Sequence, residues 1–178
     1  MNFAKKSQLG ASFWAALAVV VMACVLRLIP HPPNFSPIGA MALFGGAYLV
    51  FPALRVVLPV LVLFLSDVVL GFHDQMVAVY ASVILVSFLG IGLGENATAK
   101  RVMARSLLGS VLFFVITNFA VWLQSGFYPR TLSGLAECYW LALPFFQNSV
   151  AGDLVYTALF FGGWALARRW IPVLRTAQ

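Results

Sequence analysis

The sequence predicts an all-α membrane protein, a six-transmembrane-helix bundle that forms one domain over residues 1–178. Three observations predict it. First, 62% of the residues are hydrophobic and only 9% are charged, whereas soluble domains have roughly a quarter of their residues charged. Second, the chain divides into six apolar segments. Third, the gaps between these segments hold most of the basic residues, as in the cytoplasmic loops of membrane proteins.

The six segments are residues 11–29, 37–51, 56–72, 76–93, 106–124 and 149–167. A lipid-crossing helix needs about 20 apolar residues, with about 17 as the minimum. The first segment follows Lys5 and Lys6 like a signal peptide, but it continues to Ile29 without a clear cleavage site, so we expect an uncleaved helix. The second is short, and we expect it to begin in an irregular stretch around Pro37 that protein shields from lipid.

The distribution of basic residues predicts both termini in the cytoplasm. Only Arg27 and Arg130 then lie near the outer face. The cytoplasmic basic residues are Lys5, Lys6, Arg55, Lys100, Arg101, Arg105, Arg168, Arg169 and Arg175. A nucleic-acid partner is not expected, because the net charge of +6 is not gathered on one aromatic-rich face.

A short helix is also expected in the outer loop between helices 5 and 6. Apolar residues recur there at helical spacing, namely Leu132, Leu135, Tyr139, Trp140 and Leu143. Two interpretations stay open for it: an anchor in the headgroup region, or a lid over the outer mouth of the bundle.

Ionisable residues inside membrane segments are unfavourable and usually face the bundle interior or a water-filled cavity. Asp67 falls in the outer third of its segment and either forms a ligand-binding wall or pairs with Arg27 to hold two helices together. Asp153 either faces a cavity or complements a helix dipole. Asn118 either faces the same cavity or links two helices by a hydrogen bond.

Together these polar residues predict one small-molecule site in the outer half of the bundle, with the loop from Pro30 to Pro37 stiffened by four prolines as a wall. The candidate substrate-binding residues are Arg27, His31, Asn34, Asp67, His73, Asp74, Tyr80, Asn118, Trp122, Trp140, Asp153 and Tyr156. No metal, cofactor or catalytic residue is predicted, and the open question is whether Cys138 or a histidine ligates a metal centre.

Two other function classes are weighed against binding and transport. An intramembrane enzyme would need a nucleophile with a base, or two histidines spaced as zinc ligands, and only Asp67 with His73 could supply an acid and an imidazole. The protein is therefore not expected to be an enzyme. A structural or assembly subunit without a ligand is the alternative.

Small residues mark a possible partner face on the first helix. Ala11 and Ala15 form a small-x-x-x-small pair with Ala18 nearby, which allows either close packing inside the bundle or docking of another membrane protein.

The stretches "NFSPIGAMALFGGAYL", "LSDVVLGF" and "NSVAGDLVYTALFFGG" together resemble the substrate-binding S-component of energy-coupling-factor (ECF) vitamin transporters. The resemblance implies a six-helix, multi-pass protein of the bacterial inner membrane that takes up a vitamin, cofactor precursor or metal ion from the outer face. It also implies docking of Ala11 and Ala15 onto a transmembrane coupling subunit driven by two ATPases. Solitary members of that group bind cobalamin through a cysteine, but here His73 and Tyr80 stand where that cysteine would be.

Overall fold

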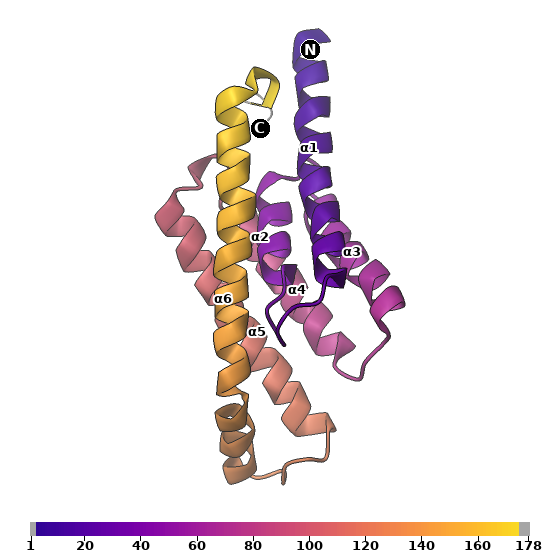
Figure 1. Cartoon of the computed structure of the whole chain (residues 1–178), viewed down its shortest axis with the longest axis vertical. Helices are drawn as coiled ribbons and strands as arrows, with labels where there is room; N and C mark the ends of the chain where they lie inside the picture. Colours follow the sequence, from indigo (N-terminus) through magenta and orange to yellow (C-terminus); the bar gives the residue numbers. More distant parts are fainter. Residues whose placement is uncertain (1–2, 175–178) are drawn as a thin grey trace.

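The computed structural model describes residues 3–174, and within that range the chain forms six α-helices, two 3-10 helices and no strand (Figure 1). The α-helices are α1 (Phe3–Leu28), α2 (Ile38–Tyr48), α3 (Leu54–Leu70), α4 (Met76–Ile91), α5 (Ala99–Gln124) and α6 (Leu132–Trp170). The 3-10 helices are η1 (Gly94–Asn96) and η2 (Pro172–Leu174).

Three helices are long and apolar enough to cross a membrane. They are the Gly10–Leu28 part of α1, α5 and α6, whereas α2 and α4 are shorter apolar helices. Large hydrophobic side chains such as Val69 on α3 and Phe119 on α5 remain exposed, as they do on a surface that contacts lipid. The helices therefore indicate a membrane protein.

The helices run alternately up and down, so that α1 begins and α6 ends at the same end of the molecule (Figure 1). This end is called the terminal end below. Three arginines satisfy backbone carbonyls near it. Arg55 donates from Nε to the carbonyl of Leu49, 2.7 Å away, just after α2, and Arg105 donates to the carbonyl of Leu89 on α4. Arg101 donates to the carbonyl of Asn96.

Helix α2 lies in the centre of the bundle and contacts each of the other five α-helices. Its residues from Ala40 to Tyr48 are all buried, so it is covered by protein and not by lipid. Its eleven residues span only about 16 Å. A helix enclosed by protein does not have to cross the whole bilayer, which explains why the second predicted segment is short. Pro37, at the N-cap and also buried, confirms the shielded start expected there.

Two glycines let α2 and α4 touch along their backbones. A Cβ atom on Gly46 would lie 2.1 Å from the backbone oxygen of Ser87, and one on Gly90 would lie 2.2 Å from the backbone oxygen of Leu43. Both distances are far shorter than any real contact to a Cβ atom. The crossing of α2 and α4 therefore requires glycine at both positions.

The separate short helix expected between helices 5 and 6 is not present; that part of the prediction is wrong. Residues 132–148 instead form the first part of α6, which continues through Pro144 to Trp170. Contacts with α5 hold this part in line: Tyr139 donates to the carbonyl of Val115 at 2.6 Å, and the rings of Phe114 and Phe146 lie 4.5 Å apart. Periodicity detects a helical segment but does not reveal that it joins the next one.

Candidate functional site

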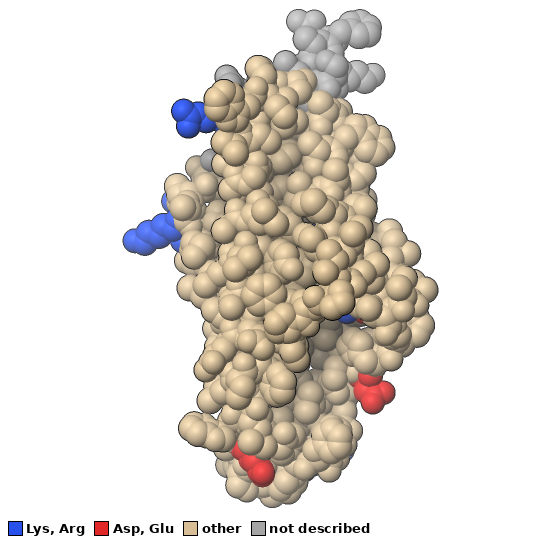
Figure 2. All heavy atoms as spheres, viewed as in Figure 1, with Lys and Arg blue, Asp and Glu red and all other residues tan. Residues whose placement is uncertain are grey.

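A cavity of about 300 Å³ opens among the ends of α1 to α4 that lie away from the terminal end. The surface is hollowed between α6 and the hairpin of α3 and α4 (Figure 2). The lining residues come from all six α-helices and two loops and are Arg27, His31, Asn34, Ser36, Ile38, Gly39, Leu70, His73, Val79, Val83, Val86, Gly109, Phe113, Ser149 and Asp153.

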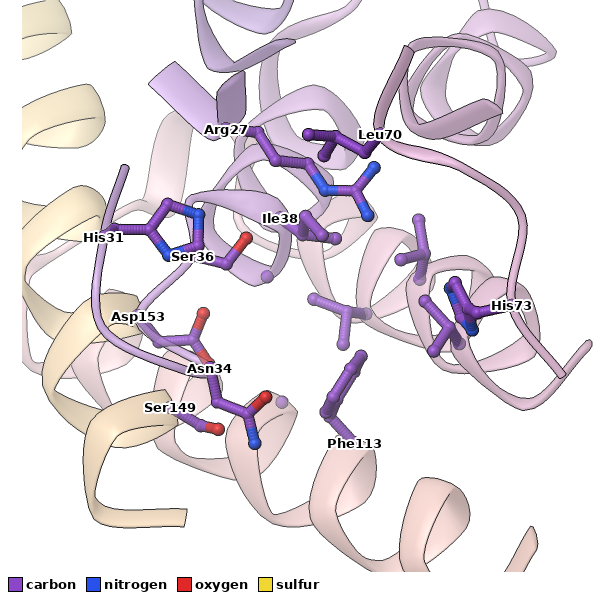
Figure 3. Close-up of a pocket in the computed structure, with 15 residues that line it drawn as sticks. Arg27, His31, Asn34, Ser36, Ile38, Leu70, His73, Phe113, Ser149 and Asp153 are labelled. Carbon is purple, nitrogen blue, oxygen red and sulfur yellow. The ribbon is translucent and has the colours of Figure 1, made fainter. Parts of the chain in front are cut away.

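The lining is divided into a polar and an apolar side (Figure 3). His31, Asn34, Ser36, Ser149 and Asp153 lie together on one side of the close-up, on the loop after α1 and on α6. On the opposite side Figure 3 shows Phe113 of α5 and also His73. Phe113 and the lining valines of α4, Val79, Val83 and Val86, are called the apolar side below.

The loop between α1 and α2, called the first loop below, is fixed against α6. Phe35 donates its backbone N–H to the carbonyl of Pro32 at 3.0 Å, and Asn34 takes a positive φ of 62° at this turn. Asn148 of α6 donates from Nδ2 to the carbonyl of Pro33 at 3.0 Å. A side chain at Gly152 would press on the backbone of Phe35 and Ser36, so glycine there lets the loop lie flat on α6.

Asp153 reaches from α6 to the start of α2. Its Oδ2 accepts a hydrogen bond from the Ser110 hydroxyl of α5 at 2.6 Å, and the carboxylate also accepts the backbone N–H of Ala40. A Cβ atom on Gly39 would lie 2.2 Å from Oδ1. A carboxylate at a helix N-terminus satisfies free N–H groups and complements the helix dipole. The expected dipole interaction with the helix that carries Asp153 is wrong, because α6 begins at Leu132; the carboxylate lies at the N-terminus of α2 instead, and it also lines the cavity.

Asp67 is fully buried and forms an ion pair with Arg27, with Nη1 2.6 Å from Oδ1. Tyr80 donates its hydroxyl to Oδ2 at 2.7 Å, and Arg27 also donates to Ser66 and to the carbonyl of Leu63. This set, called the Arg27 network below, joins α1, α3 and α4. Of the two interpretations of Asp67, the pairing with Arg27 matches this geometry, and Arg27 alone of the pair lines the cavity.

Five of the twelve predicted site residues line the cavity, namely Arg27, His31, Asn34, His73 and Asp153. His31 donates from Nδ1 to the carbonyl of Pro32 at 3.0 Å, which leaves Nε2 for other partners. Asp67 and Tyr80 sit behind Arg27 in its network.

The other five predicted residues do not line the cavity. Asn118 donates to the carbonyl of Phe114 in its own helix, Trp122 donates to the carbonyl of Pro129, and Tyr156 packs its ring 5.7 Å from that of Phe35. Asp74 is exposed, and Trp140 is 72% exposed. The exposure of Trp140 fits the anchor interpretation of that segment better than the lid.

Sequence reasoning missed several lining residues. Ser36 has a buried hydroxyl oxygen without a hydrogen-bond partner among the described residues, and such an atom calls for a ligand or water. Its position within the proline-rich first loop was the available signal. Phe113 and Val83 carried none, because an apolar residue in an apolar helix has the same pattern whether it faces lipid or a cavity.

Cys138 lies away from the cavity. It is buried in α6, and its thiol donates to the carbonyl of Asn118 at a distance of 3.4 Å. Over residues 3–174, no group of three or more His, Cys, Asp or Glu side chains is arranged to hold a metal ion.

The expected partner face on α1 is only partly open. Ala11 and Ala15 are half-buried and Ala18 is exposed. Trp14 is 66% exposed, and it shares the helix face of Ala11 and Ala18 at spacings of three and four residues. A partner at this face would therefore meet a tryptophan as well as small residues.

Comparison with known proteins gives one match. A family model described as "Family of unknown function (DUF6580)" matches residues 7–174. No curated protein and no solved structure matches the chain. Since the family match spans almost the whole sequence, the chain belongs to this family of unknown function, DUF6580.

Proposed function

We propose that the protein is a six-span protein of the bacterial inner membrane that binds a small molecule from the outer face and takes part in its uptake. The observation that carries the proposal is the cavity itself. Charged side chains inside a membrane bundle are unfavourable, so those that border a cavity usually mark a functional site. Here residues of all six α-helices line the cavity. Loops and rigid helices that converge on one cavity are typical of ligand sites.

The orientation in this proposal rests on charge. Basic side chains gather toward the terminal end, and acidic ones are seen toward the opposite end (Figure 2). Among the cytoplasmic basic residues predicted from the sequence, Arg175 lies outside the described residues, and the side chains of Lys5 and Lys6 are not described either. By the positive-inside rule this charge distribution supports a cytoplasmic terminal end, and the proposal accordingly has the cavity mouth on the outer side.

The cavity volume limits the size of the ligand. A volume of about 300 Å³ is at the lower end of the range for ligand pockets. A vitamin-sized or smaller molecule fits this volume, whereas a corrinoid such as cobalamin is much too large for the cavity as it stands.

Native mass spectrometry of the detergent-purified protein tests the proposal. We expect a bound small molecule, and we expect Val79→Trp to remove it, because Val79 lines the cavity and an indole there would fill it. Val77→Trp is the matched control, since Val77 lies on the same helix but is 79% exposed.

The outcomes of this experiment separate two functions. Loss of the bound molecule in Val79→Trp, with retention in Val77→Trp, supports a ligand site in the cavity. If the wild-type protein carries no small molecule, a structural or assembly subunit becomes the better interpretation. If Val79→Trp retains the molecule as the wild type does, the ligand binds elsewhere.

The resemblance to ECF S-components adds a partner to the proposal: a transmembrane coupling subunit with ATPases that docks on the face of Ala11, Ala15 and Ala18. We expect Ala18→Trp to reduce uptake of the molecule identified above to background while the purified variant still binds it. Ala18 is exposed, so an indole there would obstruct a partner without entering the core.

Ala104→Trp is the control for this prediction, because Ala104 is an exposed alanine on α5. Equal uptake by Ala18→Trp and the wild type would show that this face of α1 has no role in transport.

A further inference from the structure

We propose that the cavity selects a small organic cation, a protonated amine attached to an apolar body of about the size of one aromatic ring. This inference rests on the proposed function, that the cavity is a ligand site. It follows from the balance of charge around the cavity and from the division of its lining into two sides.

The positive charge of Arg27 is already compensated. Its guanidinium contacts the Asp67 carboxylate at 2.6 Å and also donates to Ser66 and to the carbonyl of Leu63. Asp67 is itself fully buried behind Arg27 and takes a further hydrogen bond from Tyr80. Arg27, the member of the pair that lines the cavity, is thus already paired with the Asp67 carboxylate behind it, and an anionic ligand would have to compete with Asp67 for the guanidinium.

Asp153 has no cationic partner within the described residues that corresponds to Arg27 beside Asp67. Among the described residues, the Asp153 carboxylate accepts hydrogen bonds from the hydroxyl of Ser110 and the backbone N–H of Ala40, both neutral donors. The N-terminus of α2 contributes the equivalent of about half a positive charge. With histidines counted as neutral, Arg27 and Asp153 are the charged residues of the lining, and Asp153 is the one of the two without an ion-pair partner among the described residues.

The polar side offers the acceptors that an ammonium group requires. An ammonium group has three N–H donors and no acceptor. Beside Asp153 lie the hydroxyl of Ser36, whose oxygen is buried and without a partner in the described part of the chain, and the side chains of Asn34 and Ser149 (Figure 3). An amine bound here would therefore meet a carboxylate and several oxygen acceptors.

The apolar side accommodates the body of the ligand. Phe113 stands across the cavity from this polar cluster (Figure 3), and Val79, Val83 and Val86 of α4 complete the wall. A flat apolar ring between the valines and the phenyl group would bury its surface there, with its charged group toward Asp153.

Three probes that share one ring and differ in charge test the inference: benzylamine, benzyl alcohol and benzoate. Each is titrated into the full-length protein in detergent, and its Kd is obtained from the shift of the unfolding midpoint with concentration. The same titration on Val79→Trp, in which the indole fills the cavity, measures the background shift caused by probe that partitions into the detergent. We expect benzylamine to bind at least about tenfold more tightly than benzyl alcohol, and benzoate to bind weakest.

Two variants locate the selection. Asp153→Asn should bring the Kd of benzylamine close to that of benzyl alcohol, and Phe113→Ala should weaken all three probes alike. Phe119→Ala, on the same helix but 47% exposed, is the control for the latter and should change none of them. If Asp153→Asn does not fold without its carboxylate at α2, Ser36→Ala is the second test and should weaken benzylamine more than benzyl alcohol.

The outcomes distinguish this inference from the proposed function. Binding of benzyl alcohol or benzoate as tightly as benzylamine would overturn the selection for a cation but leave the cavity as a ligand site. Binding of none of the probes above the Val79→Trp background would also overturn the selection. The molecule retained in native mass spectrometry then decides on the ligand site independently.

Discussion

Replacement of Asp67 by asparagine is expected to lower the free energy of unfolding by about 3–5 kcal/mol. The carboxylate is fully buried and accepts the charge of Arg27, whose side chain is itself only 13% exposed. Removal of one member of a buried ion pair leaves the other charge without compensation in a medium where this is very unfavourable. Equilibrium unfolding in mixed micelles with an increasing fraction of SDS, followed by circular dichroism, measures the change.

Two further variants show that the effect belongs to the pair. In the double variant Arg27→Met with Asp67→Leu, no charge is left behind, and most of the lost stability should return. Asp74→Asn, at an exposed acid seven residues further along, should stay within about 0.5 kcal/mol of the wild type. A small loss in Asp67→Asn, equal to that in Asp74→Asn, would mean that the Arg27 network does not hold α1, α3 and α4 together.

The second large effect is expected for Gly46→Ala. The added methyl group would lie 2.1 Å from the backbone oxygen of Ser87 and 3.0 Å from the Cα atom of Gly90. Overpacking usually costs about 1–3 kcal/mol. Here the obstructing atoms belong to the backbone of α4 and have no other rotamer to adopt, so we expect a loss of at least about 3 kcal/mol.

Gly163→Ala is the matched control for this prediction. Gly163 lies in α6, is exposed, and has no atom within 4 Å of the position that a Cβ would take. Alanine favours helix over glycine by up to about 1 kcal/mol, so this variant should be as stable as the wild type or slightly more stable. Comparable stability of Gly46→Ala and Gly163→Ala in the same unfolding assay would show that α2 and α4 do not cross in close contact.

The helices themselves were largely predictable, because the lengths of the apolar segments and the charges between them can be read directly from the sequence. The predicted third and fourth segments, residues 56–72 and 76–93, lie within two residues of α3 and α4 at each end. The start of α6 was placed too late by 17 residues, at Ser149 in place of Leu132. Ser133, Glu137, Gln147 and Asn148 interrupt the apolar pattern of residues 132–148, and Pro144 lies among them, so the sequence did not show that these residues continue into the next segment as one helix.

The site was predictable only where a residue was unusual for its surroundings. Charged residues in or next to apolar segments, such as Arg27 and Asp153, were assigned to the cavity, which they line. Asn118 is also a polar residue in an apolar segment, but its side chain donates a hydrogen bond to the carbonyl of Phe114 in its own helix. Which neighbour a side chain meets depends on how the helices are rotated against one another, and the pattern of one helix does not contain that information.

The burial of α2 has a consequence for how the chain enters the membrane during synthesis. A stretch of 11 helical residues is too short to insert stably by itself, since about 20 apolar residues are needed. The ribosome delivers α2 before α3, α4 and α6 exist to enclose it. We therefore expect α2 to reach its buried position only after the C-terminal half of the chain has been synthesised. A chain halted after Tyr48 would leave α2 outside the bilayer core.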